Sequence, residues 1–507
     1  MRATSGSSTP SAAPAEARRG ALALLALVAG IVGLRVLALA YARTDLFVDE
    51  AQYWLWGREL AFGYYSKPPL IGWVIRAVTE LAGSNAIFWV RLAAPLAHGA
   101  TALILAQIAA ETAGRRAALW VALGYLTLPM VAVGSAVIST DTIMLPFLAL
   151  ALWAWRRALL ADGRRRLGLA ALAGLGIGLG AMAKYAALYY LAGAGLAAAL
   201  WPSARPGWRA AGLALAVMLL CLMPNILWNA LHGWPTLQHT ADNISWVEDP
   251  DDRAGLHFGA LLTFLGGQFL VFGPLSFAVF LALAAAWGER DASDRLWLAA
   301  GLPILALVAG QALLAYAYAN WAVAAYLPAS LVTFAWAARR PRFGALAVAA
   351  NAALCLALIA ATLRPADLVL PSGRPLLARY LGHAAVSEQI LAAARARGLG
   401  VVVADGRELL ADLFYTGRHS GLRFYAALPK ACDADDDCFH DQYQMTHPVL
   451  AELPGPALFA SYAGPPPCPA APLGQLAPVP GTWQKGPIGL WQVGPDCWAA
   501  EGAHRTP

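Results

Sequence analysis

The sequence predicts an α-helical membrane protein with many spans, followed by a small C-terminal α/β domain. Only 13% of the 507 residues are charged and 59% are hydrophobic, whereas soluble globular proteins carry about 25% charged residues. Apolar runs of membrane length alternate with short loops that contain clusters of arginine. This pattern ends at residue 363, and residues 364–507 are more polar. A nucleic-acid-binding role does not follow from the net charge of +6, because the arginines lie in loops between apolar runs.

The chain begins with a segment that is too polar to span a membrane. Residues 1–20 are rich in Ser, Ala and Pro, and we expect them to form a disordered cytoplasmic tail. The apolar run 21–40 is long enough for a first crossing. A secretory signal peptide is the competing interpretation, because residues 38–40 resemble a cleavage site, but the run is longer than a usual signal core.

The arginine clusters predict the topology, because basic residues collect in cytoplasmic loops. Placing every cluster inside gives about eleven spans, with the N-terminus inside and residues 364–507 outside. The segment 167–201 must contain two spans, since one helix of that length would measure ~52 Å and the hydrocarbon core is only ~30 Å thick. The expected spans are 21–40, 87–110, 117–134, 143–155, two within 167–201, 210–228, 257–287, two within 296–338, and 343–363.

The transmembrane domain, residues 21–363, also contains two amphipathic segments on its outer side. Residues 50–62 and 70–82 are rich in Tyr and Trp, which anchor helices at the level of the lipid headgroups. We therefore expect interfacial helices within residues 50–82.

The last domain, residues 364–507, is expected to be periplasmic and to mix helices with strands. Residues 382–397 and 407–416 have helical patterns, and 400–405 has the pattern of a buried strand. Four cysteines in an oxidising compartment indicate two disulfides. The pairs that we expect are Cys432 with Cys438 and Cys468 with Cys497. The acidic loop between the first pair could be a calcium site, but its spacing favours a solvated turn.

Ionisable residues at a membrane edge are costly and therefore indicate function. Under the predicted topology the conspicuous polar residues within the membrane or at its edge fall on the outer side, which implies one outward-facing cavity. These residues are Asp49, Glu50, Lys67, Arg91, His98, Asp141, Lys184, His239, Asp242 and Asn243. Each residue also has a structural explanation. Acidic residues favour the first turn of a helix, and the Arg91 side chain could extend to the membrane interface. His98 could be a core histidine, Lys184 could be a turn residue, and residues 239–243 could be ordinary loop residues.

Two carboxylates and a lysine in one cavity suit a lipid-phosphate sugar donor. A phosphodiester needs a cation to bind it and to stabilise the leaving phosphate, and Lys67 lies before two prolines that restrict its backbone. A carboxylate can accept the proton of an attacking hydroxyl. Asp49 is the first candidate for this base and Asp141 is the second. No tight His/Asp spacing indicates a metal site, and we expect neither metal nor cofactor.

Several motifs in order resemble the membrane glycosyltransferases of the type-C fold, which include protein O-mannosyltransferases and lipid A aminoarabinose transferases. They cover roughly residues 20–340. The motifs are Asp49-Glu50, the segment Gly63–Ile71 (Gly-Tyr-Tyr-Ser-Lys-Pro-Pro-Leu-Ile), Val90-Arg91-Leu92, Ser139-Thr140-Asp141, Ala183-Lys184-Tyr185, Trp234–His239 and Tyr326-Leu327-Pro328.

The resemblance implies that a sugar is transferred with inversion from a polyprenyl-phosphate carrier to an acceptor on the outer side of a bacterial inner membrane. It implies that Asp49 is the catalytic carboxylate, that Lys67 binds the donor phosphate and that Asp141 helps to shape the sugar pocket. We expect Asp141 to be catalytic as well, and Arg91 and Lys184 to bind the donor phosphate together with Lys67. The expected substrate pocket comprises Glu50, Tyr53, Tyr64, His239, Asp242, Asn243 and Tyr326. Lipid A, the lipopolysaccharide core, another envelope glycan and a protein all remain possible acceptors, and we expect a monomer.

One residue departs from the pattern of the aminoarabinose transferases. Ser66 precedes Lys67, where those enzymes have an acidic residue that could pair with an amino sugar. This difference argues against an aminoarabinose donor and leaves a neutral hexose or a uronic acid. The alternative function is a lipid or sugar transporter or flippase. Transporters usually show internal repeats and ionisable residues near mid-membrane, and neither pattern is evident in this sequence.

Overall fold

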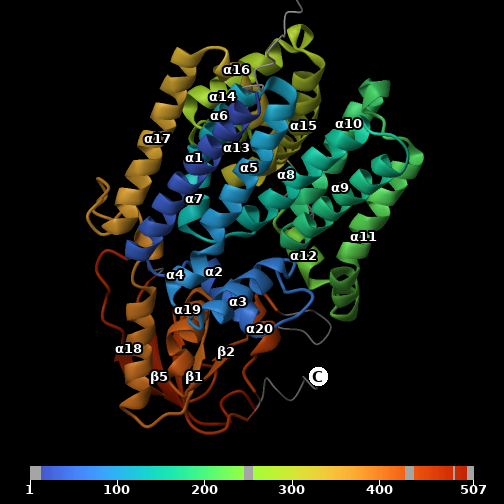
Figure 1. Cartoon of the computed structure of the whole chain (residues 1–507). Helices are drawn as coiled ribbons and strands as arrows, with labels where there is room; N and C mark the ends of the chain where they lie inside the picture. Colours follow the sequence, from blue (N-terminus) through green and yellow to red (C-terminus); the bar gives the residue numbers. More distant parts are fainter. Residues whose placement is uncertain (1–12, 245–254, 429–438, 451, 483–485, 500–507) are drawn as a thin grey trace, which may run out of the picture.

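The computed structural model confirms a mostly helical membrane protein with a small C-terminal sheet. It describes residues 13–244, 255–428, 439–450, 452–482 and 486–499. Long helices form a bundle, and short helices lie between this bundle and the C-terminal region (Figure 1). The first helix begins at Ala13, so residues 13–20, which we expected in a disordered tail, are helical.

The bundle contains thirteen α-helices among the described residues. They are α1 (Ala13–Tyr41), α5 (Ala93–Ala113), α6 (Arg115–Leu126), α7 (Pro129–Ala136), α8 (Thr140–Leu159), α9 (Gly163–Ala183), α10 (Tyr189–Leu200), α11 (Trp208–Leu231), α13 (Phe258–Val271), α14 (Pro274–Ala285), α15 (Ala292–Leu314), α16 (Tyr326–Ala338) and α17 (Pro341–Leu363).

In the described part of the chain, eight helical segments are long and apolar enough to cross a membrane, or up to ten if each bent pair is one span. The predicted hairpin in 167–201 is present as α9 and α10, and Lys184 lies at the break between them. The predicted span 257–287 is not one continuous helix. It consists of two helices that meet at 113°, because Gly273 has a positive φ of 85° and Pro274 begins α14. The count of eleven spans stays a prediction.

Short helices outside the bundle position the polar residues at one end of it. They are α2 (Val48–Arg58), α3 (Leu70–Ala82), α4 (Ile87–Arg91) and α12 (Pro235–Asp242). Helices α2 and α3 match the two predicted interfacial segments. Helix α3 ends at Gly83, whose φ of 62° closes the helix with a left-handed residue. Both helices pack against each other beneath the bundle (Figure 1).

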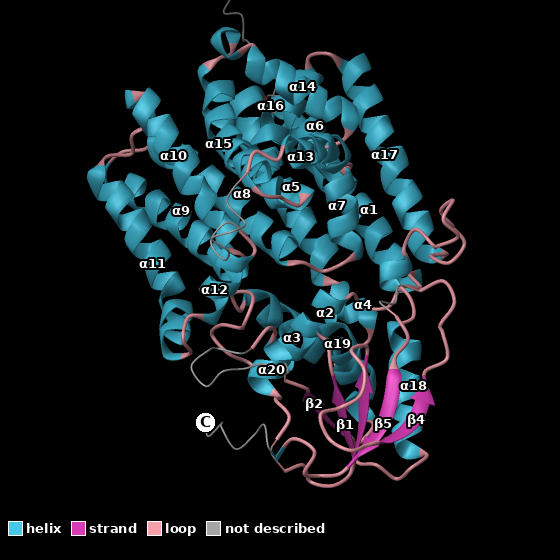
Figure 2. Cartoon of the chain, turned by 180° about the vertical axis from the view of Figure 1, so that it is seen from behind, coloured by secondary structure: helices cyan, strands magenta, loops and turns pink. Residues whose placement is uncertain are grey.

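The C-terminal region is an α/β unit in which a five-stranded sheet is covered by helices (Figure 2). The strand order is β2-β1-β3-β5-β4, in which β2, β1 and β3 are parallel and β5 is antiparallel to both of its neighbours, β3 and β4. Its elements are α18 (His383–Arg395), β1 (Val401–Ala404), α19 (Arg407–Thr416), β2 (Arg423–Ala426), α20 (Gln442–Thr446), β3 (Ala457–Ser461), β4 (Ala471–Gln475) and β5 (Gly489–Val493). The predicted helix, strand and second helix correspond to α18, β1 and α19.

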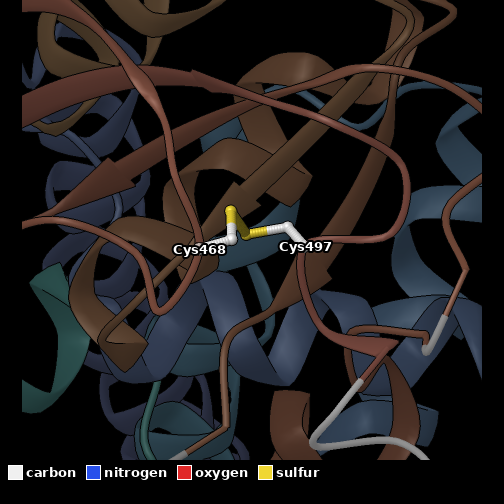
Figure 3. The surroundings of a disulfide bond; sticks show 2 residues. All are labelled: Cys468 and Cys497. Atoms are coloured by element: carbon white, nitrogen blue, oxygen red, sulfur yellow. A yellow bond between two sulfur atoms is a disulfide. The ribbon is translucent and has the colours of Figure 1, made fainter.

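A disulfide joins Cys468 to Cys497, as expected, and closes the β4–β5 end of the sheet (Figure 3). The other expected pair, Cys432 with Cys438, lies outside the described residues. The remaining cysteines, Cys221 and Cys355, are free and lie within bundle helices.

We expect the double substitution of Cys468 and Cys497 by serine to destabilise the C-terminal region. The bridge closes a loop with a sequence separation of 29 residues, for which loss of chain entropy in the unfolded state predicts about 3–4 kcal/mol. Hydrogen exchange of β4 and β5 in the full-length protein should become faster. Cys221→Ser is the matched control and should leave this exchange unchanged. Equal protection in the double variant would contradict the prediction.

Candidate active site

Glu50 and Arg91 form a buried ion pair that fixes the start of α2. Arg91 Nε and Nη2 donate to the two carboxylate oxygens of Glu50, at 2.8 and 2.7 Å. The same guanidinium donates to the Thr44 hydroxyl and to the backbone carbonyl that follows it. Glu50 also accepts the backbone N–H groups of Phe47 and Ile138. Both side chains are at most 2% exposed.

These contacts change the roles that we expected for both residues. Arg91 was expected to bind the donor phosphate, and Glu50 was expected to line the substrate pocket. Their hydrogen-bonding groups are instead used within the protein, and burial leaves no access for a substrate. The geometry therefore favours a structural role for Glu50 and Arg91.

Asp49, the neighbour of Glu50 on α2, forms an ion pair with the C-terminal region. Its Oδ1 accepts a hydrogen bond from Nη2 of Arg407, the first residue of α19. Arg407 Nε also donates to Oε1 of Gln52, one turn along α2, at 2.5 Å. The side chain of Asp49 remains 42% exposed, and its Oδ2 has no hydrogen-bond partner within the described ranges. The sequence analysis missed Arg407, which lies 358 residues from Asp49.

Asp141 is held more tightly than Asp49. The N-cap Ser139 accepts the backbone N–H of Thr142, which starts α8 and places Asp141 in its first turn. Both carboxylate oxygens of Asp141 accept from Nζ of Lys184, at 2.8 and 2.9 Å. A further bond comes from the side-chain amide of Asn320. Asp141 is only 14% exposed, so the two predicted catalytic carboxylates have different access.

Lys67 lies in the loop between α2 and α3, and the surrounding elements hold this loop from several sides. The Thr236 hydroxyl, on α12, donates to the backbone carbonyl of Tyr64 at 2.7 Å. The backbone N–H of Tyr65 donates to Gln442 Oε1, on α20 of the C-terminal region, at 2.7 Å. The side-chain amide of Asn225, on α11, donates to the carbonyl of residue 62. The position of Lys67 therefore depends on both the bundle and the C-terminal region.

The Lys67 ammonium has no hydrogen-bond or ion-pair partner among the residues that the structure describes. Its pKa is lowered to about 8, mainly by burial and secondly by the charge of Lys184, while Asp49 and Asp141 act in the opposite direction. Arg407 also adds repulsion. The ammonium is thus within electrostatic range of both carboxylates and of their two cations. The structure brings together these five ionisable side chains, which we call the charge cluster.

His239 lies at the edge of the charge cluster. Its ring is 5.2 Å from that of Tyr65, centroid to centroid. Burial lowers the pKa of His239 to about 4, and the nearby charge of Lys67 contributes to this shift. The imidazole is therefore neutral at pH 7 and can offer a hydrogen bond without adding charge. Asn243 donates from its side chain to the His239 carbonyl, and Asp242 is the last residue of the same helix, α12.

The predicted pocket tyrosines fall into two groups. Tyr53, one turn after Asp49 on α2, is 4% exposed, and burial together with the Asp49 charge raises its pKa well above 10. Tyr64 instead stacks on Trp56 at 4.4 Å and donates to the Trp56 carbonyl. Tyr326 is fully buried and donates to Oε1 of Gln268 at 2.5 Å. Packing holds both rings inside the protein, which favours structural roles for Tyr64 and Tyr326, and their pocket roles stay a prediction.

His98 has the structural role that we weighed as its alternative. It is 1% exposed, and its ring nitrogens contact the hydroxyl groups of Tyr125 and Thr142. No group of three or more His, Cys, Asp and Glu residues suitable for a metal ion occurs among the described residues. The chemistry available in the charge cluster is therefore that of carboxylates and cations: proton acceptance, and stabilisation of anionic oxygens.

Known proteins with similar sequences place the chain in a family. The lipid A galacturonosyltransferase RgtD of Rhizobium johnstonii is 40% identical over 441 residues, which cover 86% of this chain and 90% of that protein. The chain belongs to the RgtD family of membrane glycosyltransferases. A family model described as dolichyl-phosphate-mannose-protein mannosyltransferase matches residues 66–228. The resemblance to type-C membrane glycosyltransferases is thereby confirmed.

Solved structures show that the RgtD-family chain has the ArnT fold. The crystal structure of ArnT from Cupriavidus metallidurans in the apo state has a TM-score of 0.64 at 14% identity, and covers 97% of this chain and 100% of that chain. The structure of the same protein bound to undecaprenyl phosphate has a TM-score of 0.61 at 15% identity, and covers 93% and 97%. The fold match extends over the C-terminal region, which the sequence motifs did not reach.

We expect Glu50→Gln to lower the free energy of unfolding by about 3–5 kcal/mol, because it leaves the buried Arg91 charge unpaired. Thermal or chaotrope unfolding of the purified protein in nanodiscs measures this loss. The matched control is Glu80→Gln, which removes the exposed ion pair between Glu80 and Arg76 and should cost less than about 1 kcal/mol. A Glu50→Gln protein with unchanged stability but weakened donor binding would restore the substrate role that we first expected.

Proposed function

We propose that this protein transfers a galacturonosyl residue from a polyprenyl-phosphate carrier to lipid A at the outer face of the bacterial inner membrane. The relatives support the sugar, the acceptor and the carrier in this proposal. One relative is named a lipid A galacturonosyltransferase, and ArnT, which has the same fold, has been solved with bound undecaprenyl phosphate. In the proposed topology the N-terminus is cytoplasmic and the C-terminal region is periplasmic. The enzyme is proposed to act as a monomer. The observation that carries the proposal is the Lys67 ammonium, which has no hydrogen-bond or ion-pair partner among the described residues and lies within electrostatic range of Asp49 and Asp141.

Lys67 is the proposed ligand of the donor phosphate. In the described part of the chain, the other two cations of the charge cluster already pair with carboxylates, and Lys67 does not. A phosphodiester oxygen would give this ammonium a strong, charge-assisted partner. The same contact would stabilise the charge that develops when the lipid phosphate leaves.

Asp49 is the proposed general base, in preference to Asp141. A base needs a carboxylate oxygen that an acceptor hydroxyl can approach. Asp49 has such an oxygen in Oδ2 and is 42% exposed, whereas both oxygens of Asp141 are bound to Lys184. The acceptor oxygen attacks C1 of the sugar, its proton moves to Asp49, the C1–O bond breaks, and polyprenyl phosphate leaves with the bonding electrons.

The proposed roles of the other residues follow from their contacts. The pair of Asp141 and Lys184 lies between α8 and α9 and would shape the sugar site rather than react. Neutral His239, with Asp242 and Asn243 on the same short segment, would contact donor or acceptor hydroxyl groups. Tyr53 would line the wall next to Asp49.

We expect lipid A from a deletion strain to lose its uronic acid substituent and the uronosyl donor to accumulate, both measured by mass spectrometry. Complementation with wild-type protein should restore the substituent. Asp49→Asn should reduce turnover by about 10²–10⁴-fold, the usual contribution of a general base. Lys67→Ala should reduce kcat/KM by about 10–100-fold, as expected for loss of a hydrogen bond to a charged group.

Arg58→Ala is the control for Lys67→Ala, because Arg58 is an exposed cation at the end of α2. Its activity should equal that of wild type. Unaltered lipid A in the deletion strain would refute the acceptor. Full activity of both Asp49→Asn and Lys67→Ala would refute the proposed chemistry.

The pH dependence of kcat/KM should report Lys67 directly. Its pKa of about 8 means that the free enzyme carries the binding ammonium below that pH and loses it above. We expect kcat/KM to fall as the pH rises through about 8. In the enzyme–donor complex the phosphate should keep Lys67 protonated, so kcat should decline only at a higher pH. Lys67→Arg should abolish this alkaline decline, since a guanidinium stays charged. A decline that persists unchanged in Lys67→Arg would assign it to another group.

A further inference from the structure

A galacturonosyl donor presents two anionic groups, the phosphodiester and the carboxylate of the sugar. If the proposed function is correct and Lys67 binds the phosphate, the sugar carboxylate needs a second partner. We propose that Arg407, supplied by the C-terminal region, binds this carboxylate and selects uronosyl donors over neutral hexosyl donors.

The hydrogen bonds of Arg407 leave part of the guanidinium available. Nε is bound to Gln52 and Nη2 to Asp49, so α2 occupies one edge of the group. Nη1 has no partner among the described residues, and Nη2 has a second N–H. A guanidinium has five N–H donors, and the pair on Nη1 and Nη2 forms the fork that binds a carboxylate with two parallel hydrogen bonds. The side chain is 37% exposed, so a ligand can approach it.

The location of Arg407 fits a sugar substituent rather than the phosphate. Arg407 is within electrostatic range of Lys67 and of His239, and it contacts the proposed base Asp49 directly. A sugar bound between the phosphate ligand and the base would therefore lie beside this guanidinium. Tyr443, on α20, is also within electrostatic range of Arg407, and its buried hydroxyl has no hydrogen-bond partner among the described residues. The polar network around Arg407 thus has unused hydrogen-bonding capacity.

Lys184 is the main competing ligand for the sugar carboxylate. Its ammonium already bonds both oxygens of Asp141, and its side chain is 18% exposed. An ammonium also lacks the planar fork that matches a carboxylate. The existing bonds of Lys184 and the shape of its ammonium group therefore both favour Arg407 as the ligand of the sugar carboxylate.

The test compares two donors that differ only at C6, polyprenyl phosphate-galacturonate and polyprenyl phosphate-galactose, with full-length protein in proteoliposomes and lipid A as acceptor. We expect wild type to prefer the uronate. Arg407→Gln should lower kcat/KM for both donors to the extent that Asp49 loses its ion-pair partner, and should lower it about 10–100-fold more for the uronate, as for other lost hydrogen bonds to a charged group. Arg407→Lys should retain part of the preference, because it keeps the charge without the fork.

Controls separate this proposal from the alternatives. Arg423→Gln, an exposed arginine on β2, should behave as wild type. Equal losses with both donors in Arg407→Gln would mean that Arg407 only positions Asp49, and would overturn the proposal. Selective loss in Lys184→Gln but not in Arg407→Gln would assign the carboxylate to Lys184. If wild type uses the galactosyl donor as well as the uronate, the selectivity is absent and the proposal fails, whereas inactivity with both donors would refute the proposed function itself.

Discussion

The buried ion pair between Glu50 and Arg91 is the constraint on which the geometry of the site depends. It fixes α2 at its first turn, next to Asp49. The same Glu50 carboxylate accepts the backbone N–H of Ile138, three residues before Asp141. One buried carboxylate thus joins the chain segments that carry the proposed base, Asp49, and the proposed sugar-site residue, Asp141. Because a buried pair with all its hydrogen bonds satisfied is rigid, the separation of Asp49 and Asp141 is set before any substrate binds.

Within the charge cluster, the Lys67 ammonium lacks an anionic partner among the described residues, and the phosphate of a donor would supply one. Two carboxylates have their own cations, Arg407 and Lys184, and Lys67 is held near them by a loop that is bonded on several sides. Burial and like charges make this ammonium easier to deprotonate than a free lysine. A bound phosphate would raise the pKa of this ammonium again, because it supplies an opposite charge and hydrogen-bond acceptors. The charge cluster thus holds three cations and two carboxylates, and this excess of positive charge supports the proposed binding of an anionic lipid headgroup.

Much of this was predictable from the sequence, and the misses have physical causes. Hydrophobic periodicity predicted α2, α3, α18 and β1, and the order of Asp49, Lys67 and Asp141 predicted the site. The sequence does not reveal burial, so Tyr64 and Tyr326 resembled substrate contacts although packing holds them inside. Arg407 was missed because its partner is 358 residues away. Its position directly after strand β1 was a usable signal, since ligands often bind at the carboxyl ends of parallel strands.

The contacts of the C-terminal region argue that it is part of the active site rather than an attached module. Arg407 bonds to Asp49, Gln442 bonds to the backbone beside Lys67, and His447 lies 3.0 Å from Glu59 at the end of α2. These contacts reach both the proposed base and the proposed phosphate ligand. Removing the region would leave Asp49 without its cation and the Lys67 loop without one of its anchors. The proposed role of Arg407 in donor selection would therefore be combined with a role in catalysis, because the same few side chains determine how α2 and the Lys67 loop are oriented.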